Sequence, residues 1–559
     1  MRKLVFALLF GTACLAGPVA AQEAISVDGV EAVRVVIAPP KSELARIIKS
    51  GLAAAYQAAP RDTRAYADSQ KLYFFYGARH FEPLWLVEGG DGKVAYAPAA
   101  AKIMDVFKAA SAQGFRPSDY LTADLDLSTA GTDPAKLAAV ETAFSAAALR
   151  YAQDAVGGRV NPLEVSKLIT IKPRQINPTE MLVKLAQSDD PAALLMDLHP
   201  KYAEFVRLRK ALADFDAASV EDQVRIPDGP LLRPGMKDIR VALLRERLNV
   251  EAPEVPESAT TAPPDDIYDA PLVAAVKTFQ DSLALTADGV VGPATVAALN
   301  GGSPVTREDI IANMERWRWM PEDMGKFHVF VNIPEFRLFV EQGTAAEGYE
   351  VAYTTRVVTG KPTNQTPIFS DEIEHIVVNP YWNVPSSIAT KEIAPHLMVN
   401  PGYLASQNME MLGSNGKVIN ASAIDWSQTN INNFRVRQRP GGGNALGNIK
   451  FLFPNQHDVY LHDTPSKSLF SRSFRAYSHG CVRVQNPMEF ANALLAHEPA
   501  LTVATLEKEI GGSERWNNLA THVPVHLAYF TIRVDEDGTI RSYGDVYGHN
   551  KRLITLLSK

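Results

Sequence analysis

The chain has 559 residues, 46% hydrophobic and 21% charged, a composition that is typical of globular proteins and excludes a disordered or fibrous class. At about 150 residues per domain, the length predicts three or four domains. A formal net charge of −7, with no cluster of lysine and arginine along the chain, argues against a nucleic-acid-binding protein.

The first 21 residues are typical of an export signal. Two basic residues precede a short apolar run, and small residues at 19–21 offer a cleavage site before Gln22. The apolar run is too short to span a bilayer, which argues against a membrane anchor. A lipoprotein signal at Cys14 is a weaker alternative, because Gly11 stands where leucine is usual. We therefore expect export, with cleavage near Ala21.

Residues 22–225 are predicted to form a helical scaffold domain. Alanine-rich stretches such as 134–156 place apolar residues at helical spacing. No motif for catalysis or ligand binding occurs in this range, so scaffolding is the simplest interpretation.

Residues 226–303 are predicted to form a small three-helix module. Gly292-Pro293 is typical of the start of a short helix, because proline at the first helical position loses no hydrogen bond. One apolar face of a preceding helix is formed by Leu272, Val276, Phe279 and Leu283.

The turn sequence of this module carries a resemblance. Residues 288–295, behind 276–280, are similar to the peptidoglycan-binding domain of wall hydrolases. A generic three-helix spacer is the alternative. The stretch 251–266 interrupts the module, and its proline and acidic residues predict a flexible surface loop.

Residues 304–511 are predicted to form a β-rich domain. Val329, Val331 and Ile333 alternate with Phe330 and Asn332, which is typical of a strand. A turn at Pro334-Glu335 follows. Further strand-like runs occupy 351–358, 373–378, 449–453 and 459–462.

Residues 385–447 interrupt this strand pattern. The stretch is polar and ends in the glycine run 441–443, so it is expected to form an inserted lid or cap. Residues 512–559 are expected to form a C-terminal hairpin segment, with its turn at Asp537-Gly538. Together the segments predict an α+β multidomain protein with a β-rich domain that carries a capping subdomain.

Candidate catalytic residues gather around Cys481, the one cysteine left after signal removal. A thiolate is a strong nucleophile for acyl transfer, and an imidazole can take the thiol proton. His462 and His479 are both candidates for the imidazole that takes the proton of Cys481. Gly480 permits a tight turn that could aim the amides of Gly480 and Cys481 at an oxyanion, and Arg483 adds positive charge. A zinc site is disfavoured, because a fourth ligand is missing.

The run Ser478-His479-Gly480-Cys481-Val482-Arg483, with His462 19 positions before the cysteine, resembles the signature of L,D-transpeptidases with the YkuD fold. The resemblance implies that Cys481 is the nucleophile and His462 the general base. It also implies that Ser478, His479 and Gly480 shape the oxyanion region. Arg483, Tyr460 and Trp382 are the expected substrate-binding residues.

Further elements match this family. Thr359-Gly360 and Thr366-Pro367 resemble its Thr-Gly and Thr-Pro elements, although Ile368 stands where many members have glycine. Residues 379–385 resemble the start of the cap in the large periplasmic subclass. Trp382 could line the substrate channel or anchor the cap to the core. The resemblance therefore predicts a periplasmic enzyme with a scaffold, a wall-binding module and a capped catalytic domain.

The implied reaction is a two-step acyl transfer without metal or organic cofactor. Cys481 attacks a peptidoglycan tetrapeptide stem, D-alanine leaves, and a diaminopimelate side-chain amine resolves the thioester into a 3–3 cross-link. Expected partners are stem peptides and glycan, with no nucleic acid, and carbapenem-type inhibitors are expected to acylate the cysteine. Attachment of an outer-membrane protein, removal of D-alanine alone, and a non-catalytic wall-binding scaffold are the alternatives.

Overall fold

The computed structural model describes residues 37–559 except 62, 91–92, 218–223, 225, 228, 253–265, 283–284 and 300–304. The expected export signal, Leu283 and most of the loop expected at 251–266 lie outside the described residues. Within the described ranges, no helix is both long and apolar enough to cross a bilayer.

The chain divides into two compact units that alternate along the sequence. The first comprises the described residues up to Ser111 together with Phe115–Ala155 and Gln175–Leu198, and the second comprises Ala112–Gly114, Val156–Arg174 and His199–Lys559. The range 22–225 is mainly helical, as predicted. Its last helix, α8 (Ala203–Ala217), belongs to the second unit.

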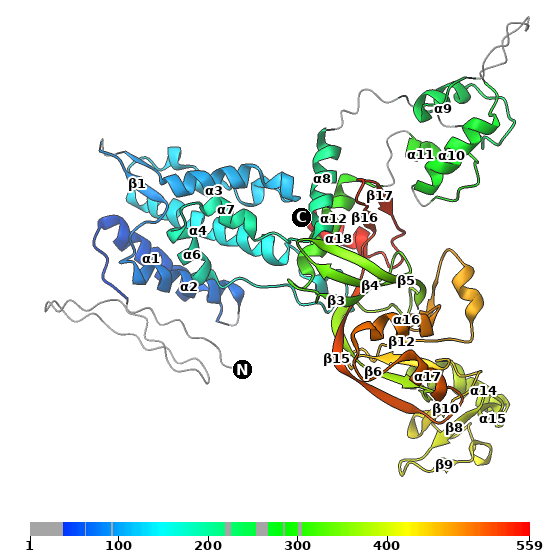
Figure 1. Cartoon of the computed structure of the whole chain (residues 1–559). Helices are drawn as coiled ribbons and strands as arrows, with labels where there is room; N and C mark the ends of the chain where they lie inside the picture. The colour runs from blue at the N-terminus through cyan, green and yellow to red at the C-terminus, as the bar shows by residue number, and fades with distance from the viewer. Residues whose placement is uncertain are drawn as a thin grey trace, which may run out of the picture. The chain divides into compact units, whose positions relative to one another are not determined.

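The first unit is a helical body (Figure 1). Its core is rich in aromatic side chains. Trp85, Phe107 and Phe144 are fully buried in it. The buried Glu141 accepts hydrogen bonds from the Tyr76 hydroxyl (2.7 Å) and the Trp85 amide (3.0 Å). Its helices are α1 (Glu43–Ala58), α2 (Arg64–Ala78), α3 (Pro98–Lys108), α4 (Pro134–Gly157), α6 (Pro178–Gln187) and α7 (Pro191–Asp197), with a ribbon of β1 (Leu86–Glu88) and β2 (Val94–Tyr96).

The small module contains α9 (Arg240–Leu248), α10 (Ala270–Ser282) and α11 (Pro293–Leu299), which confirms its helical prediction. Its motif residues bind one another. The side-chain amide of Gln280 donates to the Val290 carbonyl (3.0 Å) and to Thr295 Oγ1 (3.2 Å), and its oxygen accepts from the Gly289 amide (2.9 Å). Gly289 has a φ of 75°, which explains the glycine. The motif therefore fixes the turn onto α10.

The second unit contains a nine-stranded sheet with the order β13-β5-β14-β12-β11-β6-β15-β3-β4. β4 also pairs with β5, so the sheet closes on itself. Val329 and Val331 of β3 enter its inner core, whereas Phe330 enters a second core on the other face. The strands are β3 (Phe327–Asn332), β4 (Arg337–Thr344), β5 (Gly348–Gly360), β6 (Phe369–Val378), β11 (Ile449–Leu452), β12 (Leu461–His462), β13 (Ala476–Ser478), β14 (Val482–Val484) and β15 (Arg515–Ala528).

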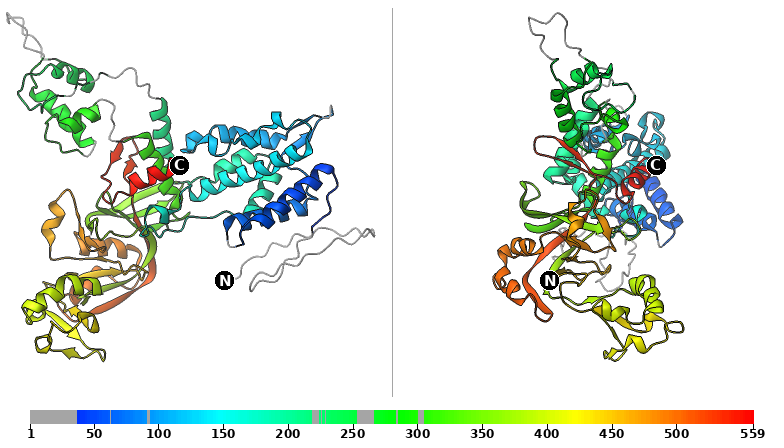
Figure 2. Two further views of the ribbon diagram at one scale, coloured as in Figure 1. Left: turned by 180° about the vertical axis from the view of Figure 1, so that it is seen from behind. Right: turned by 90° about the vertical axis from the view of Figure 1, so that its right-hand side faces the viewer.

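Helices cover the second core face, where α12 (Arg307–Trp319) meets both α8 and α18 (His549–Leu557) (Figures 1 and 2). Phe205, Trp317 and Leu553 supply buried side chains from these three helices. Three further helices of this unit are α5 (Pro162–Val165), α16 (Pro487–Leu494) and α17 (Val503–Glu509).

The C-terminal region is part of the sheet rather than a separate hairpin segment. β15 lies between β6, to which it is antiparallel, and β3, to which it is parallel. The predicted hairpin is present but short, with β16 (Ile532–Val534) paired to β17 (Ile540–Ser542). Residues 525–528, expected in the hairpin, extend β15 instead, because both neighbouring strands offer backbone partners.

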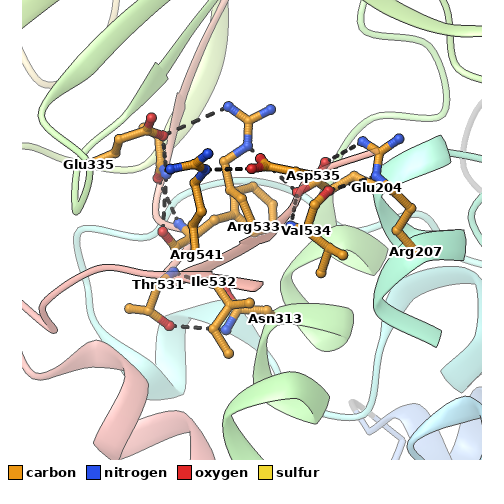
Figure 3. Close-up of polar contacts among 12 residues, drawn as sticks. Glu204, Arg207, Asn313, Glu335, Thr531, Ile532, Arg533, Val534, Asp535 and Arg541 are labelled. Carbon is orange, nitrogen blue, oxygen red and sulfur yellow. Dashed lines mark hydrogen bonds and ion pairs between the residues drawn. The ribbon is translucent and has the colours of Figure 1, made fainter. Parts of the chain in front are cut away.

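Charged contacts hold this hairpin against α8 and the turn between β3 and β4 (Figure 3). Glu204 accepts from the Val534 amide (3.0 Å), and Arg207 donates to the Val534 carbonyl (2.7 Å). Arg533 lies between Glu204 (3.6 Å) and Glu335 (3.8 Å). These contacts therefore fix the hairpin to the rest of the second unit.

Residues 382–447 form a small body with its own sheet, ordered β7-β10-β8-β9. Leu397, Met411 and Trp426 belong to its separate core. An insertion was predicted here, but its strands were not, because strands of two to four residues give too few alternations to detect. Its elements are β7 (Trp382–Asn383), α13 (Ser386–Ile388), α14 (Ala394–Val399), α15 (Tyr403–Ser406), β8 (Met409–Leu412), β9 (Val418–Ile419) and β10 (Arg435–Gln438).

Candidate active site

The two main site residues come from neighbouring strands. β12 and β14 run parallel, with Leu461 opposite Val482 and His462 opposite Arg483. Since side chains alternate between faces along a strand, Tyr460 and His462 project from the same face as Cys481 and Arg483. One strand pairing thus closes the 19-residue separation between His462 and Cys481.

Cys481 lies between β13 and β14 as a free, half-buried cysteine. Its sulfur approaches the Asp458 carbonyl at 3.9 Å. Burial raises the pKa of the Cys481 thiol, while hydrogen bonds from Tyr460 and the charge of Arg483 oppose that rise. The resting side chain is therefore a protonated thiol, and nucleophilic attack requires a base.

His462 is suited to be that base. It is buried, and its Nδ1–H donates to the backbone carbonyl of Asp463, which leaves Nε2 with a free lone pair. Burial, followed by the charge of Arg483, lowers the pKa of His462 to about 3. The imidazole is thus neutral at pH 7. No hydrogen bond joins it to the Cys481 sulfur among the described contacts, and catalytic bonds of this kind often form only with substrate.

The loop before Cys481 is held by its own polar groups. Ser478 Oγ donates to the Cys481 carbonyl (2.5 Å) and accepts from the Gly480 amide (3.1 Å). Gly480 has a φ of 123°, which confirms the tight turn. Its amide, however, was expected to face an oxyanion and is instead committed to Ser478. The amide of Cys481 remains the candidate oxyanion donor.

Tyr547 supports this loop from the C-terminal region, a role that sequence analysis missed. Its hydroxyl donates to the Gly360 carbonyl (2.7 Å) and accepts from the Thr366 amide (3.1 Å). Thr366 Oγ1 in turn accepts from the Gly360 amide (2.9 Å) and donates to the Gly480 carbonyl (2.7 Å). The Thr-Gly and Thr-Pro elements therefore form one network with the nucleophile loop. Ile368 bonds to residues Leu168 and Thr170 outside this network.

The insertion contacts the nucleophile loop through His479. Glu392, on a single π-helical turn (Ala389–Ile393), lies 2.7 Å from His479 Nε2. Lys361 Nζ lies 3.4 Å from the same nitrogen. Because the carboxylate can only accept, Nε2 carries the hydrogen, and a neutral His479 then has its lone pair on Nδ1. Single π-helical turns are frequent at functional sites.

Replacing Glu392 with alanine is expected to lower the rate of Cys481 acylation about two- to fivefold, because the pair is partly exposed and its coupling modest. The rate at which a small acylating reagent modifies Cys481 would measure this. Lys391→Ala, at the neighbouring exposed position, is the matched control. Equal rates for Glu392→Ala and the native enzyme would show that the contact does not support the loop.

The other end of the insertion contacts the residue beside His462. The Asp463 carboxylate accepts from the Asn448 amide (3.0 Å) and the Thr464 amide (2.7 Å), and it pairs with Lys467. Gly447 has a φ of 61°, and a Cβ there would overlap the Asp463 carboxylate. The glycine thus lets the insertion end against Asp463, the residue that follows His462.

Gly447→Ala is expected to destabilise the enzyme by about 2–4 kcal/mol, through the left-handed backbone and the overlap with Asp463. Chemical denaturation would measure the loss. Gly442→Ala is the control, since nothing lies within 4 Å of a Cβ there. An equal effect of both substitutions would contradict this account.

The three expected substrate-binding residues are separated. Tyr460 and Arg483 lie at the site, and burial lowers the pKa of the half-buried Arg483. Trp382 lies in β7, opposite Gln438 of β10, and no contact with Cys481 or His462 is described for it. Its two expected roles, lining the substrate channel and anchoring the insertion to the core, both remain predictions. Lys450 of β11, opposite His462, was missed.

Across the described residues, no cluster of three or more His, Cys, Asp or Glu side chains is arranged to hold a metal ion. The site itself offers a thiol, a neutral imidazole and nearby cations. This combination can perform nucleophilic acyl transfer.

Comparison with family models assigns residues 326–506 to a known type of domain. The L,D-transpeptidase catalytic domain model of the YkuD family matches residues 326–506. Residues 326–506 are an L,D-transpeptidase catalytic domain. The models described as "Scaffold domain" and "Putative peptidoglycan binding domain" match residues 70–212 and 240–299. The chain thus has the multidomain organisation that the sequence predicts, while the predicted boundaries remain predictions.

A curated Haemophilus influenzae protein named "Putative L,D-transpeptidase" is 33% identical over 270 residues, 46% of this chain and 52% of the relative. The chain thus spans about half the length of that relative. A solved L,D-transpeptidase from Xylanimonas cellulosilytica is 16% identical to this chain, with a TM-score of 0.15. The match covers 54% of this chain and 99% of the solved one. A fused Zn-dependent amidase/peptidase/peptidoglycan-binding protein from Clostridium acetobutylicum is 12% identical, also with a TM-score of 0.15. The match covers 53% of this chain and 99% of the solved one.

Proposed function

We propose that this L,D-transpeptidase forms 3–3 cross-links in peptidoglycan by cysteine acyl transfer. The observation that carries the proposal is the pairing of β12 with β14, which brings neutral His462 beside the strand of Cys481. The donor is a tetrapeptide stem, and the acceptor is the side-chain amine of a diaminopimelate residue on a second stem. We further propose that the protein acts in the periplasm after export.

In the first step, His462 Nε2 takes the Cys481 proton while the sulfur attacks the carbonyl of the third stem residue. The carbonyl oxygen becomes an oxyanion, which the Cys481 amide stabilises. The imidazolium then gives its proton to the departing nitrogen, and D-alanine leaves. A thioester between Cys481 and the stem remains.

In the second step, the acceptor amine attacks the thioester carbonyl and His462 takes its proton. The carbon–sulfur bond breaks, the thiolate recovers the proton, and an amide joins the two stems. Water competes with the amine, so an insertion that covers the site favours cross-linking over hydrolysis. The contact between Glu392 and His479 supports such a role for the insertion.

The proposal is tested by incubating the mature chain with purified peptidoglycan and analysing the digested product by mass spectrometry. We expect dimers linked between third residues, and none with Cys481→Ala. Tripeptide stems alone would indicate hydrolysis of the acyl-enzyme. Absence of both products, with Cys481 still reactive toward iodoacetamide, would overturn the proposal.

A further inference from the structure

Three basic side chains form a row across the catalytic sheet. Lys450 of β11 is opposite His462 of β12, which is opposite Arg483 of β14. Residues paired across strands project from the same face, so the row lies on the face that carries Cys481. Beyond Lys450, the row continues through Val377 to Trp516 of β15. The general base therefore has a cation on each side.

Neither flanking cation has a carboxylate partner within ion-pair distance, although the charge of the Cys481 thiolate attracts both. Within the described chain, no carboxylate lies within 4.0 Å of the charged groups of Lys450 or Arg483, and Arg483 Nε is buried without a hydrogen bond. Glu514 attracts Lys450 at longer range but accepts a hydrogen bond from the Tyr381 amide (2.9 Å). A buried charge without a partner is costly. These cations are thus positioned for an anion that arrives with the substrate.

Lys450 also has walls that suit an aliphatic chain. Its side chain is only 8% exposed, and Nζ lies 5.8 Å from the Tyr460 ring centre and 5.3 Å from that of Trp516. Trp516 is 53% exposed, unusual for a tryptophan without a ligand. Aromatic faces can contact methylene groups while the ammonium meets a charge at their end. Arg483 has no ring contact of this kind among the described pairs.

We propose that Lys450 binds a free carboxylate on the side chain of the third stem residue, and so selects donors in which this carboxylate is not amidated. The proposal rests on the proposed function, because it assigns the donor of that reaction. The aliphatic part of the third side chain lies against Tyr460 and Trp516. Arg483, beside Cys481, faces the carboxylate of the departing D-alanine.

The test is a cycle that combines a change in the enzyme with a change in the substrate. Acylation of Cys481 is followed by intact mass with two tetrapeptides, one with a free and one with an amidated third-residue side-chain carboxylate. The native enzyme is expected to prefer the free acid in kcat/KM at least about tenfold. Lys450→Met, which keeps length but removes charge, should lose this preference by slowing only the free acid.

Controls separate the other roles of a cation near the thiol. Lys361→Met, next to His479, is expected to keep the preference. The native enzyme is expected to acylate more slowly with a donor whose D-alanine carboxylate is amidated, because Arg483 faces that group. Lys450→Met should show the same slowing with this donor. Iodoacetamide should alkylate Cys481 in Lys450→Met at close to the native rate, which also reports an intact site. If the lysine does not tolerate methionine, Lys450→Gln is used instead.

Three results would overturn the proposal: equal acylation of the native enzyme by both donors, a preference that persists without Lys450, or an equal slowing of both donors together with slower alkylation. The last would mean that Lys450 acts on the thiolate. Acyl-enzyme from neither donor, with Cys481 still alkylated, would overturn the proposed function as well.

Discussion

Cys481→Ala is expected to abolish cross-linking, with a loss of at least about 10³-fold, because no other thiol stands among the described residues to form the thioester. The side chain is half-buried and its removal leaves the strand pairing of β14 unchanged, so the fold should persist. Mass spectrometry of digested peptidoglycan measures the activity, and circular dichroism measures the fold.

Cys481→Ser keeps the shape of the site with a weaker nucleophile and is the matched control. Neither variant should gain mass with a carbapenem, whereas the native enzyme should. Dimers formed by Cys481→Ala at close to the native rate would show that another group is the nucleophile.

His462→Gln is expected to slow acylation about 10²- to 10⁴-fold, the usual contribution of a general base. The thiol is protonated at neutral pH because burial raises its pKa, and the neutral imidazole supplies the acceptor. Since the pKa of His462 is about 3, the native rate should not fall through protonation of this base between pH 8 and pH 5. In His462→Gln, the rate should instead rise with pH as hydroxide ionises the thiol. Acylation reactions quenched at set times between pH 5 and pH 8 and analysed by intact mass spectrometry would measure the pH dependence of both rates.

His479→Gln is the control for this experiment. The His479 ring contacts Glu392 and lies outside the row of site residues. The acylation rate should therefore fall less in His479→Gln than in His462→Gln. A larger loss for His479→Gln than for His462→Gln would reverse the roles of the two histidines.

Sequence analysis succeeds for the part of the site that is encoded by a local motif. In the run from Ser478 to Arg483, a glycine before the thiol predicts a tight turn, and Gly480 has a φ of 123°. The alternation in residues 329–333 likewise predicts β3 correctly. Sequence could not show that the Gly480 amide is used by Ser478, because that depends on the rotamer of a neighbouring side chain.

Long-range partners could not be predicted either. Tyr547 reaches Gly360 across 187 positions, and neither residue carries a local sign of the contact. Lys450 left a weak signal, as a single charge inside the apolar run Ile449–Leu452. Its meaning depends on strand register, which sets His462 opposite it. Register between distant strands follows from the closed sheet and not from any one segment.

The place of β15 has a consequence for when the enzyme first becomes active. The strand fills the gap between β6 and β3, and Tyr547 beyond it bonds to the loop that holds Gly480. A chain that ends before residue 515 already contains Cys481 and His462, but it lacks the strand that joins β6 to β3 and the hydroxyl that bonds to Gly360 and Thr366. We therefore expect the thiol of an incomplete or still-emerging chain to stay inactive until the final segment has docked.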